Sequence, residues 1–542
     1  MEFLSSQWQL GWKSISQSPI PALWYGVLIA VSLIIIRIIA VIIYRLTFHP
    51  LTNYPGPWLS KFTDLPGAYY VAKGHLHIET EKAHRQWGPI VRLGPTKLVF
   101  NSATALHDIY YSKDVQKSFG YTTMAPTPGA YNIFTAVDKD VHRHKRRVIS
   151  QGFSDRCLRA FEPMILKEID IFVGKFTKSQ NSQEEWSAPT NMTECCRYIS
   201  FDIMGDFGFG QSFELQERAD NRFLMDAVVA TSKKAAVYVH YPALAKLRLE
   251  EMFARRTLRM REKYLKLMSY LVKSRLEADK NLHNDLFSFL VDAKDPETGD
   301  GFTESELWAE SRFLLIAGAD TTSTALAGCF FYLSAYPSCY KRLVSEIRGT
   351  FASGSEIESG QKMSRCVYLR ACIDEAMRMS PPITGILWRE VCSGGTVLDN
   401  EFIPEGYDVG VSLYSIHHNE ALFPDSYTFK PERWMPGECG SLEALERARH
   451  AFNPFSLGAR ACAGRNMAYM ELSDTLARTI WHLDFRRAEG FLGSIGAGVE
   501  GARDGRDKVM EFQMEDYLTV HHKGPFLQFR ARKDVDHELF EK

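Results

Sequence analysis

The sequence predicts a mainly α-helical protein with a small β region, an α+β fold, in one large domain behind an N-terminal membrane anchor. Three observations lead to this prediction. A helical pattern runs without a break from Thr303 to Tyr336, several short apolar runs flank turn residues, and Pro21 to Leu46 are almost continuously apolar. The 542 residues contain no internal repeat and no long linker. A single domain with a terminal extension is therefore the simplest organisation.

The composition excludes several functional classes. The chain is 45% hydrophobic and 24% charged, as in globular proteins, and its net charge of −1 provides no basic surface for nucleic acid. Its 10 cysteines include no CxxC pair, so neither a disulfide framework nor a zinc site is indicated. Reduced, mostly buried cysteines suit a body that faces the cytosol.

The first 46 residues are predicted to be a single-pass membrane anchor. Trp24 and Tyr44 near the two ends of the apolar run are typical of a membrane interface. Because Arg37 interrupts the run, we place the span near residues 20–36, and residues 38–44 then lie at the interface or extend the helix. The alternative is a buried core helix, but about 20 apolar residues match a bilayer.

The charges on either side of the span predict its orientation. Arg37, Arg45 and Lys61 outweigh Lys13, which places the body on the cytosolic side by the positive-inside rule. Three prolines between His49 and Pro57 predict a stiff, non-helical connector. We therefore divide the chain into an anchor (1–46), a hinge (47–60) and a catalytic domain (61–542).

The body is expected to contain few strands. Residues 90–100 read as a hairpin around Gly94-Pro95, residues 385–391 and 397–413 as short strands, and residues 518–529 as a hairpin around Lys523-Gly524-Pro525. Residues 210–250 are expected to be helical, and residues 490–507 to be a surface loop. A further helix is predicted from Ser364 to Met379, where Ser380-Pro381-Pro382 ends it.

The helix from Thr303 to Tyr336 is predicted to cross the domain. Thr303 and Glu306 form a capping box at its start, and its pattern is apolar nearly all round, as in a buried helix. Its middle reads Ala317-Gly318-Ala319-Asp320-Thr321-Thr322. Small residues leave a groove there. Burying an acid and hydroxyl groups costs free energy, which suggests that they serve a function. The alternative is that the threonines bond back to the preceding turn and bend the helix.

Charged residues elsewhere suggest a bound anion and a buried ion pair. His142 and Arg146 share a helix face, where they either hold a buried anion or belong to a solvated basic face. Arg389, in a strand, is a second candidate. Glu375 and Arg378 are spaced for an ion pair, which becomes a buried network if Arg433 joins it.

Cys462 lies in Phe455-Ser456-Leu457-Gly458-Ala459-Arg460-Ala461-Cys462-Ala463-Gly464. A lone cysteine is more often a buried structural residue, but its neighbours here favour a presented thiolate. Gly458 permits a tight bend, and Gly464 lets the next helix approach a flat ligand. That helix aims its N-terminal amides at the sulfur, while Phe455 can shield it and Arg460 can pair with a carboxylate.

With these motifs in this order, the chain resembles the cytochrome P-450 family of haem-thiolate monooxygenases. The resemblance covers nearly everything after the anchor and implies the fold of that family. It rests on the cysteine motif, on Glu375 with Arg378, on Pro431-Glu432-Arg433 and on Ala317 to Thr322. His142 departs from the tryptophan found in many members, although a histidine can also donate to a propionate. Residues 49–57 and 389–395 resemble the fungal, membrane-bound branch associated with natural-product pathways.

The resemblance implies a set of roles. Cys462 is the axial ligand of the iron of haem b, and His142, Arg146, Arg389 and Arg460 neutralise the haem propionates. O2 binds in the groove at Gly318, and Thr321, helped by Asp320, delivers protons. Electrons come from NADPH through a cytochrome P-450 reductase, with or without cytochrome b5. This partner is expected to dock near Arg143, Lys145 and Arg147, which we expect to face outward.

The expected location is the endoplasmic reticulum membrane, with the catalytic domain in the cytosol. The expected substrate is a hydrophobic small molecule in fungal secondary metabolism, held by residues 115–135, 210–250, 313–321 and the apolar Ile383, Ile386 and Leu387. Two alternatives remain open. One is a haem-thiolate isomerase or dehydratase that needs no O2, and the other is a non-enzymatic haem sensor.

Overall fold

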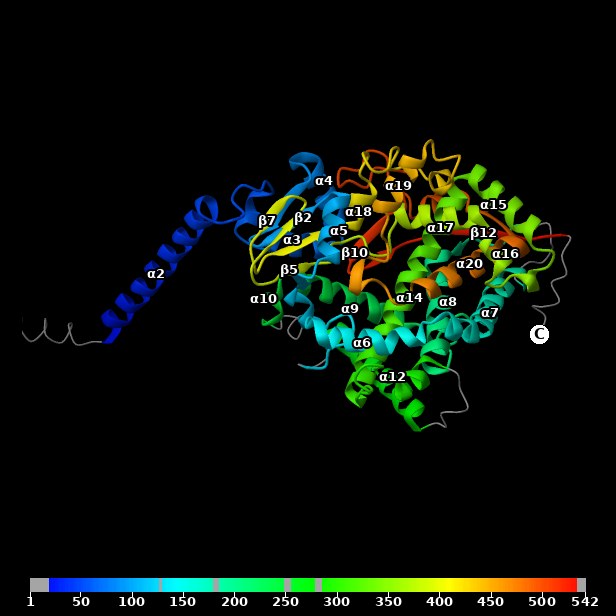
Figure 1. Cartoon of the computed structure of the whole chain (residues 1–542), viewed down its shortest axis with the longest axis horizontal. Helices are drawn as coiled ribbons and strands as arrows, with labels where there is room; N and C mark the ends of the chain where they lie inside the picture. Colours follow the sequence, from blue (N-terminus) through cyan, green and yellow to red (C-terminus); the bar gives the residue numbers. More distant parts are fainter. Residues whose placement is uncertain (1–18, 126–128, 179–184, 248–254, 278–284, 534–542) are drawn as a thin grey trace, which may run out of the picture.

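A computed structural model describes residues 19–125, 129–178, 185–247, 255–277 and 285–533 of the chain. Figure 1 shows a helical body from which one long helix, α2, projects. Helices form most of the body and short strands form a minor part, as the sequence predicted.

The apolar N-terminal run is one helix, α2 (Pro19–Thr47), and it continues through Arg37 without interruption. Of the two open predictions for residues 38–44, the extended helix is the one observed. The side chains from Trp24 onward are exposed almost throughout, and no part of the candidate span Trp24–Thr47 is buried in the body. Because an isolated apolar helix of this length matches a bilayer, α2 fits a membrane anchor. The helix α14 is also long and apolar enough to span a membrane, but it is largely buried and is therefore a core helix.

The connector after α2 packs onto the body. Arg92, which is fully buried, donates from Nη1 to the carbonyl oxygen of Leu51 at 3.1 Å. The backbone N–H of Arg92 donates to the carbonyl of Pro55 at 2.8 Å. These bonds join the proline-rich segment to the first strand, so the segment has a defined path.

The core is built around α14 (Glu304–Ala335), which crosses the body in Figure 1. The predicted capping box is present, with Thr303 as N-cap and Glu306 as its partner. Most of α14 is buried because α8 (Met192–Phe209), α17 (Val367–Met379) and α20 (Arg465–His482) pack around it. A helix enclosed on several sides needs apolar residues all round, which is the pattern that the sequence shows.

The remaining helices surround this core. The α-helices are α3 (Leu65–Ala72), α4 (Leu76–Trp87), α5 (Ala103–Tyr111), α6 (Lys139–Gly152), α7 (Asp155–Lys178), α9 (Phe223–His240), α10 (Pro242–Ala245), α12 (Arg255–Glu277), α13 (Leu286–Asp292), α15 (Pro337–Thr350), α16 (Gln361–Ser364), α18 (Leu413–His417), α19 (Leu442–Ala451) and α21 (Phe491–Ser494). The 3₁₀ turns are η1 (Trp58–Lys61), η2 (Phe119–Met124), η4 (Gly354–Glu356), η5 (Pro431–Trp434) and η6 (Gly458–Arg460). The helix predicted from Ser364 to Met379 is α17, which begins three residues later, at Val367, while Ser364 ends the short α16.

The largest sheet has the strand order β1-β2-β8-β5-β3. Its strands are β1 (Ile90–Gly94), β2 (Lys97–Phe100), β8 (Asp408–Val411), β5 (Arg389–Val391) and β3 (Val115–Lys117). The antiparallel β1–β2 pair confirms the predicted hairpin around Gly94-Pro95. A two-stranded sheet pairs β6 (Thr396–Leu398) with β7 (Glu401–Ile403).

The prediction of a hairpin from residue 518 to residue 529 is wrong. The strand β11 (Thr519–His522) pairs with the preceding β10 (Met514–Tyr517), and Leu518, at φ +79°, makes the turn. The strand β12 (Phe526–Ala531) instead lies between β4 (Thr190–Asn191) and β9 (Leu483–Arg487). Thus β11 pairs with the strand just before it and β12 pairs with strands distant in sequence, so the two predicted hairpin strands do not pair with each other.

Candidate active site

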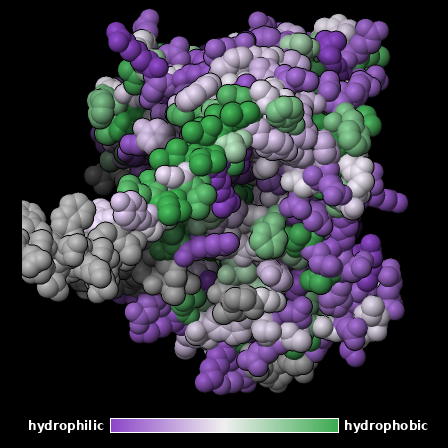
Figure 2. All heavy atoms as spheres, turned by 90° about the vertical axis from the view of Figure 1, so that its left-hand side faces the viewer, coloured by the Kyte–Doolittle hydropathy of each residue, from purple (hydrophilic) through white to green (hydrophobic). Residues whose placement is uncertain are grey.

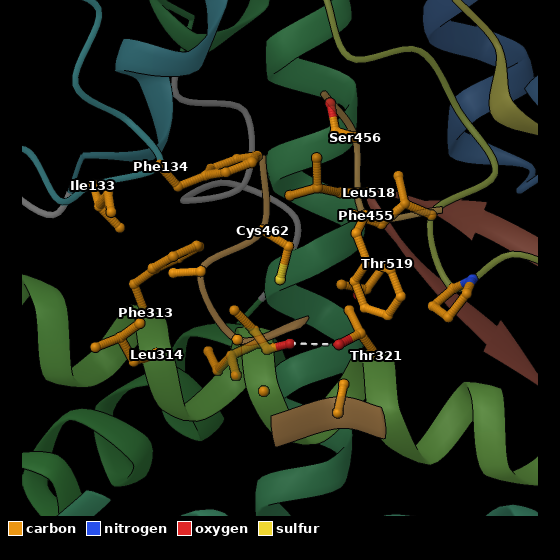
Figure 3. Close-up of a pocket in the computed structure, with 18 of the residues that line it drawn as sticks. Ile133, Phe134, Phe313, Leu314, Thr321, Phe455, Ser456, Cys462, Leu518 and Thr519 are labelled. Carbon is orange, nitrogen blue, oxygen red and sulfur yellow. Dashed lines mark hydrogen bonds between the residues drawn. The ribbon is translucent and has the colours of Figure 1, made fainter. Parts of the chain in front are cut away.

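An internal cavity of about 360 Å³ lies between α14 and the segment that carries Cys462. Its walls come from α14, α20, the loop 132–134, α9 and the segments 382–389 and 454–464. Figure 3 shows the sulfur of Cys462 pointing into the space in front of α14, where Thr321 lies. The segments that enclose the cavity therefore come from most of the length of the body.

The backbone around Cys462 is held in a tight bend. The N–H of Cys462 donates to the carbonyl of Phe455 at 2.9 Å, which closes the loop on itself. Gly458 has φ +70°, and a Cβ atom there would collide with the carbonyl oxygen of Tyr110 on α5. Ser456 also has a positive φ, +58°. Only glycine avoids both strain and collision at position 458, so this residue fixes the bend.

Gly464 behaves differently from Gly458. Its φ of −87° suits any residue, and a Cβ atom would come no closer than 3.5 Å to the ring of Phe153. The neighbouring protein atoms therefore do not require a glycine at position 464, which lines the cavity. The absence of a side chain there leaves cavity wall free for a ligand.

The thiol of Cys462 lies inside the protein but is open to the cavity. Enclosure raises its pKa, while the N–H of Gly464 and the charges of Arg146 and Arg465 act in the opposite direction. Arg146 also donates to the carbonyl oxygen of Ala461 at 2.5 Å, which fixes the cation beside the sulfur. These groups are placed to stabilise a thiolate.

A cluster of cations lies at one side of the cavity. Arg460 donates to the carbonyls of Ala136 and Val137 at 2.6 and 2.9 Å, and Arg389 donates to the carbonyl of Trp388 at 3.1 Å. Burial first, and then the neighbouring Arg389, lower the pKa of Arg460 to about 10. Among the residues that the structure describes, no carboxylate pairs with either guanidinium. Their charges are therefore available to an anionic ligand.

Lys117 belongs to the same cluster, although it lies in no recognisable sequence motif. It is 4% exposed, and its Nζ lies 3.4 Å from the ring centroid of Phe134 and 4.2 Å from that of Tyr121. Burial, together with Arg389 and Arg460, lowers its pKa well below the usual value. His142, also in the cavity wall, is neutral because burial and the charge of Arg460 lower its pKa to about 3. A neutral imidazole can still donate one hydrogen bond.

Thr321 lines the cavity, and its hydroxyl donates to the carbonyl of Ala317 at 2.7 Å. Figure 3 shows this bond along α14. The back-bonding that the sequence left as an alternative is therefore present, but in a side chain that also faces the cavity. The hydroxyl oxygen keeps lone pairs that can accept a hydrogen bond from a ligand or a water molecule.

The neighbouring Asp320 faces α8 and not the cavity. Arg197 on α8 donates to its carboxylate at 3.1 Å, and both side chains are buried. Gly318 brings these helices together, because a Cβ atom there would lie 2.5 Å from the sulfur of Met204 on α8. Arg197 is a second residue that the sequence did not single out.

The Glu375 network lies behind the cysteine segment, away from the cavity. Arg378 binds both carboxylate oxygens of Glu375 at 2.9 Å, and both side chains are fully buried. Arg433 lies 3.4 Å from the same carboxylate, and Trp434 donates to it at 3.0 Å. Arg378 also binds the carbonyls of His417 and Ser426 at 2.8 Å, so the network ties α17 to the segments before the cysteine.

The expectation that Lys145 faces outward is wrong. Its side chain is 1% exposed and binds Glu306 at 2.8 Å and Glu310 at 3.3 Å. Arg147 is also engaged, in a two-bond pair with Asp295 at 2.7 Å. Of the three cations expected to face outward, only Arg143 is largely exposed, at 61% of its side chain.

Two of the three apolar residues predicted for the substrate pocket are found in the cavity wall. Ile383 and Leu387 line it, whereas Ile386 packs behind it with Tyr121 and Trp388. The helix α9 contributes Thr231, Ser232 and Ala235, which lie within the predicted region 210–250. Tyr264 on α12 also lines the cavity, although its region was not predicted to do so.

The site fits a haem group. Cys462 would supply a thiolate ligand, and Arg389 and Arg460, which pair with no carboxylate in the described part of the chain, would supply cations for two propionates. The family model for cytochrome P450 matches residues 54–490 of the chain. The chain belongs to the cytochrome P450 family. This match runs from within the connector to just past β9, and it includes the cysteine motif, the Ala317–Thr322 motif, Glu375 with Arg378, and Pro431-Glu432-Arg433.

Curated relatives of this P450 are similar over nearly their whole length. The cytochrome P450 monooxygenase AKT7 of Alternaria alternata is 37% identical over 504 residues, which cover 92% of this chain and 96% of the relative. The cytochrome P450 monooxygenase poxM of Penicillium oxalicum is 36% identical, with 94% of this chain and 96% of the relative covered. For apf7 of Gibberella fujikuroi the identity is 34%, with 96% and 99% covered. The P450 described here is thus a haem-thiolate monooxygenase, an oxidoreductase that needs O2 and a source of electrons.

Proposed function

We propose that this P450 uses haem b to insert one oxygen atom from O2 into a hydrophobic small molecule. The observation that carries the proposal is a cavity in which Cys462 faces α14 at Thr321, with cations to one side that pair with no carboxylate among the described residues. When bound, the haem supplies the reduction of O2 and the transfer of oxygen to carbon. Hydroxylation is the simplest outcome.

The roles of the chain's own residues follow from their contacts. Cys462 would bind the haem iron through its thiolate, and Phe455 and the cysteine loop would enclose that sulfur. The propionates would be held by His142, Arg146, Arg389 and Arg460, together with Lys117. Thr321 is the residue that relays protons at its Oγ1. Asp320 supports this role while it is bound to Arg197, a positioning residue on α8. The Glu375–Arg378–Arg433 network is structural and keeps the cysteine segment in place.

The substrate is proposed to be largely apolar because the cavity wall is. Phe134 stacks on Phe313, with ring centroids 5.3 Å apart and planes at 16°, and Leu314, Ile316 and Leu518 lie beside them. Apolar and aromatic walls bind apolar ligands chiefly by excluding water. All three relatives named above come from fungi, and we propose a role in fungal secondary metabolism.

Electrons are proposed to come from NADPH through a cytochrome P450 reductase, with or without cytochrome b5. All three basic residues bind acids within the chain, but Lys145 and Arg147 are largely enclosed, whereas Arg143, paired with the exposed Asp140, is 61% exposed. Arg143 is therefore the most accessible of the three to an acidic partner. Electrostatic contacts of this kind mainly increase the rate of association.

The chain is proposed to be anchored by α2 in the endoplasmic reticulum membrane, with its body in the cytosol. Anchor (1–46), hinge (47–60) and catalytic domain (61–542) remain the proposed divisions. Figure 2 looks at the side of the molecule from which α2 projects, and its main band of hydrophobic side chains lies where α2 itself runs. Next to the connector, Trp58, Leu59, Leu65 and Tyr69 are each more than half exposed. A body without residues 1–47 should therefore keep part of its membrane affinity, which a vesicle sedimentation assay measures.

The spectrum of the reduced, CO-bound protein tests the axial ligand. We expect a red-shifted Soret band of the thiolate-ligated kind that is lost in Cys462→Ser. A matched Cys439→Ser change, at a half-buried cysteine in the loop before α19, should leave the band in place. An unchanged band in Cys462→Ser would contradict the assignment.

The two alternative functions predict different requirements. A haem-thiolate isomerase or dehydratase turns over substrate without NADPH, and a haem sensor consumes no O2 with substrate present. The proposed monooxygenase requires NADPH and the reductase, and it consumes O2 together with substrate. Substrate turnover that continues in the absence of both NADPH and the reductase would favour the isomerase or dehydratase.

A further inference from the structure

Within the described part of the chain, Arg312 is a guanidinium in the cavity wall without an anionic partner. It lies on α14 nine residues before Thr321, about 14 Å along the helix axis. Its side chain lines the cavity, and its Nε is buried without a hydrogen-bond partner. Nothing in the proposed function so far uses this residue.

The sequence of α14 explains why Arg312 is unpaired. The neighbours on its own helix face are Trp308, Ala309, Leu315 and Ile316, and none of them is acidic. Glu310, two residues away, points to another face and binds the N–H of Ile133 at 3.0 Å, with Lys145 nearby. Across the described ranges, no carboxylate forms an ion pair with Arg312.

The environment of Arg312 suits a ligand that is partly polar. Its guanidinium carbon lies 5.7 Å from the ring centroid of Tyr264 on α12, a tyrosine that is 4% exposed. The charge of Arg312 partly offsets the rise that burial causes in the pKa of this tyrosine. Toward Thr321 the cavity wall is apolar, with Phe313 and Ile316 following on α14.

The charges around the cavity do not balance without a further anion. Five of the lining side chains are Lys or Arg and one is acidic; they are Lys117, Arg146, Arg312, Arg389, Arg460 and Glu471. Glu471 is mostly neutral at pH 7, because burial raises its pKa to about 8. A thiolate at Cys462 and two propionates offset three of the cations. Of the other two, Lys117 lies in the propionate cluster, where burial and the neighbouring Arg389 and Arg460 lower its pKa well below the usual value. Arg312 lies apart from that cluster and is left without an anion.

We infer that Arg312 binds the carboxylate of the substrate, which is therefore an amphipathic carboxylic acid whose apolar body extends along α14 toward Cys462. The planar guanidinium matches a carboxylate, and an enclosed charge pair of this kind is stronger than one in water. Oxidation would then fall on a carbon remote from the acid, because Arg312 and Thr321 are far apart along α14. This inference rests on the proposed monooxygenase function and adds its substrate class.

Spectral titration of the haem-loaded, full-length protein tests the inference. The probes are straight-chain acids such as dodecanoic acid, aryl-substituted alkanoic acids, and the methyl ester of each. We expect at least one acid to shift the Soret band and to bind tenfold or more tightly than its ester. Arg312→Gln should weaken binding of that acid at least tenfold and leave ester and imidazole binding unchanged, and Arg312→Lys should be intermediate. Calorimetric titration gives the same affinities without the haem spectrum.

Two further variants make the result specific. Arg143→Gln removes one positive charge outside the cavity and should not change acid binding. If Lys117→Met abolishes acid binding while Arg312→Gln does not, the carboxylate site is at Lys117 and the inference is wrong. It is also wrong if every acid binds no better than its ester. A protein that gives no thiolate-type CO spectrum contradicts the proposed function, whereas a normal CO spectrum without acid preference contradicts only the role of Arg312.

Discussion

The carboxylate of Asp320, beside the cavity-lining Thr321, is bound by Arg197 from a different helix at 3.1 Å. Both side chains are buried, so each charge depends on the other for its compensation. The approach of α8 to α14 that allows this pair depends on Gly318, which leaves room for Met204. Asp320, the acid of the Ala317–Thr322 motif, is thus held by a contact on the side of α14 that faces away from the cavity.

Replacing Arg197 should destabilise the protein more than replacing an exposed arginine. Arg197→Met leaves Asp320 buried without a partner, which costs about 3–5 kcal/mol. Arg218→Met breaks an exposed ion pair with Glu214 and should cost less than about 1 kcal/mol. Denaturant unfolding of the two variants measures the difference. Equal free energies of unfolding would show that the buried pair carries no net stabilisation.

Thr321→Ala should uncouple NADPH oxidation from product formation. The variant lacks the cavity-facing hydroxyl, so protons are no longer relayed at that position and reduced oxygen leaves as peroxide. We expect product per NADPH to fall about tenfold or more, while NADPH consumption continues. Thr321→Ser restores a hydroxyl and should recover most of the coupling. Peroxide and product assays on the same sample check both, and unchanged coupling in the alanine variant would remove Thr321 from the mechanism.

Glu375→Gln should impair haem loading as well as stability. Arg378, fully buried, would lose the charge that it binds through two bonds, at a cost of about 3–5 kcal/mol. The network ties α17 to the segments before the cysteine, so a smaller fraction of the protein should hold haem. The ratio of Soret to protein absorbance and the denaturation midpoint measure the two effects. The matched exposed change Glu356→Gln, which breaks a pair with Lys362, should leave both values near those of the wild type.

Glu310 should make stability depend on pH between about 4.5 and 7. Burial raises the pKa of Glu310 from 4.5 to about 7, although Lys145 opposes the shift. In that window the folded protein binds the proton more readily than the unfolded chain does. The free energy of unfolding therefore falls as pH rises, by up to about 3 kcal/mol in total.

Urea denaturation at pH 5, 6 and 7 measures this contribution. Glu310→Gln cannot titrate, so its free energy of unfolding should decline less over this range than that of the wild type. Glu304→Gln, an exposed change at the start of α14, should keep the wild-type slope. If the free energy of unfolding of Glu310→Gln declines as steeply with pH as that of the wild type, then Glu310 is ionised throughout this range and paired with Lys145.

The parts of the fold that the sequence predicted are those specified by local signals. The capping box at Thr303 and the Gly94-Pro95 hairpin depend on residues within a few positions of one another. The hairpin at 518–529 was wrong because strand partners are chosen by the whole fold, and β12 pairs with β9 and β4. Propensity identifies a strand but not its neighbour.

The residues of the site also divide into those that a local sequence motif predicted and those that only the fold brings together. Motif residues such as Cys462 and Thr321 were found by their spacing, whereas Lys117, Arg197 and Arg312 stand alone in the sequence. One signal for Arg312 was present, because it is a charge in an apolar helix with no acid three or four residues away. Lys145 was misjudged although it lies three residues after His142 and therefore shares its inward face.

The bonds from Arg460 to the carbonyls of Ala136 and Val137 have a consequence for maturation of the enzyme. The same guanidinium is proposed to receive a propionate, so cofactor insertion and closure of the 132–137 segment act on one side chain. A chain that has not yet received its haem should leave this segment more open to proteases. Cellular quality control would then distinguish finished from unfinished protein at this segment, which is largely buried once it is closed, without access to the cysteine.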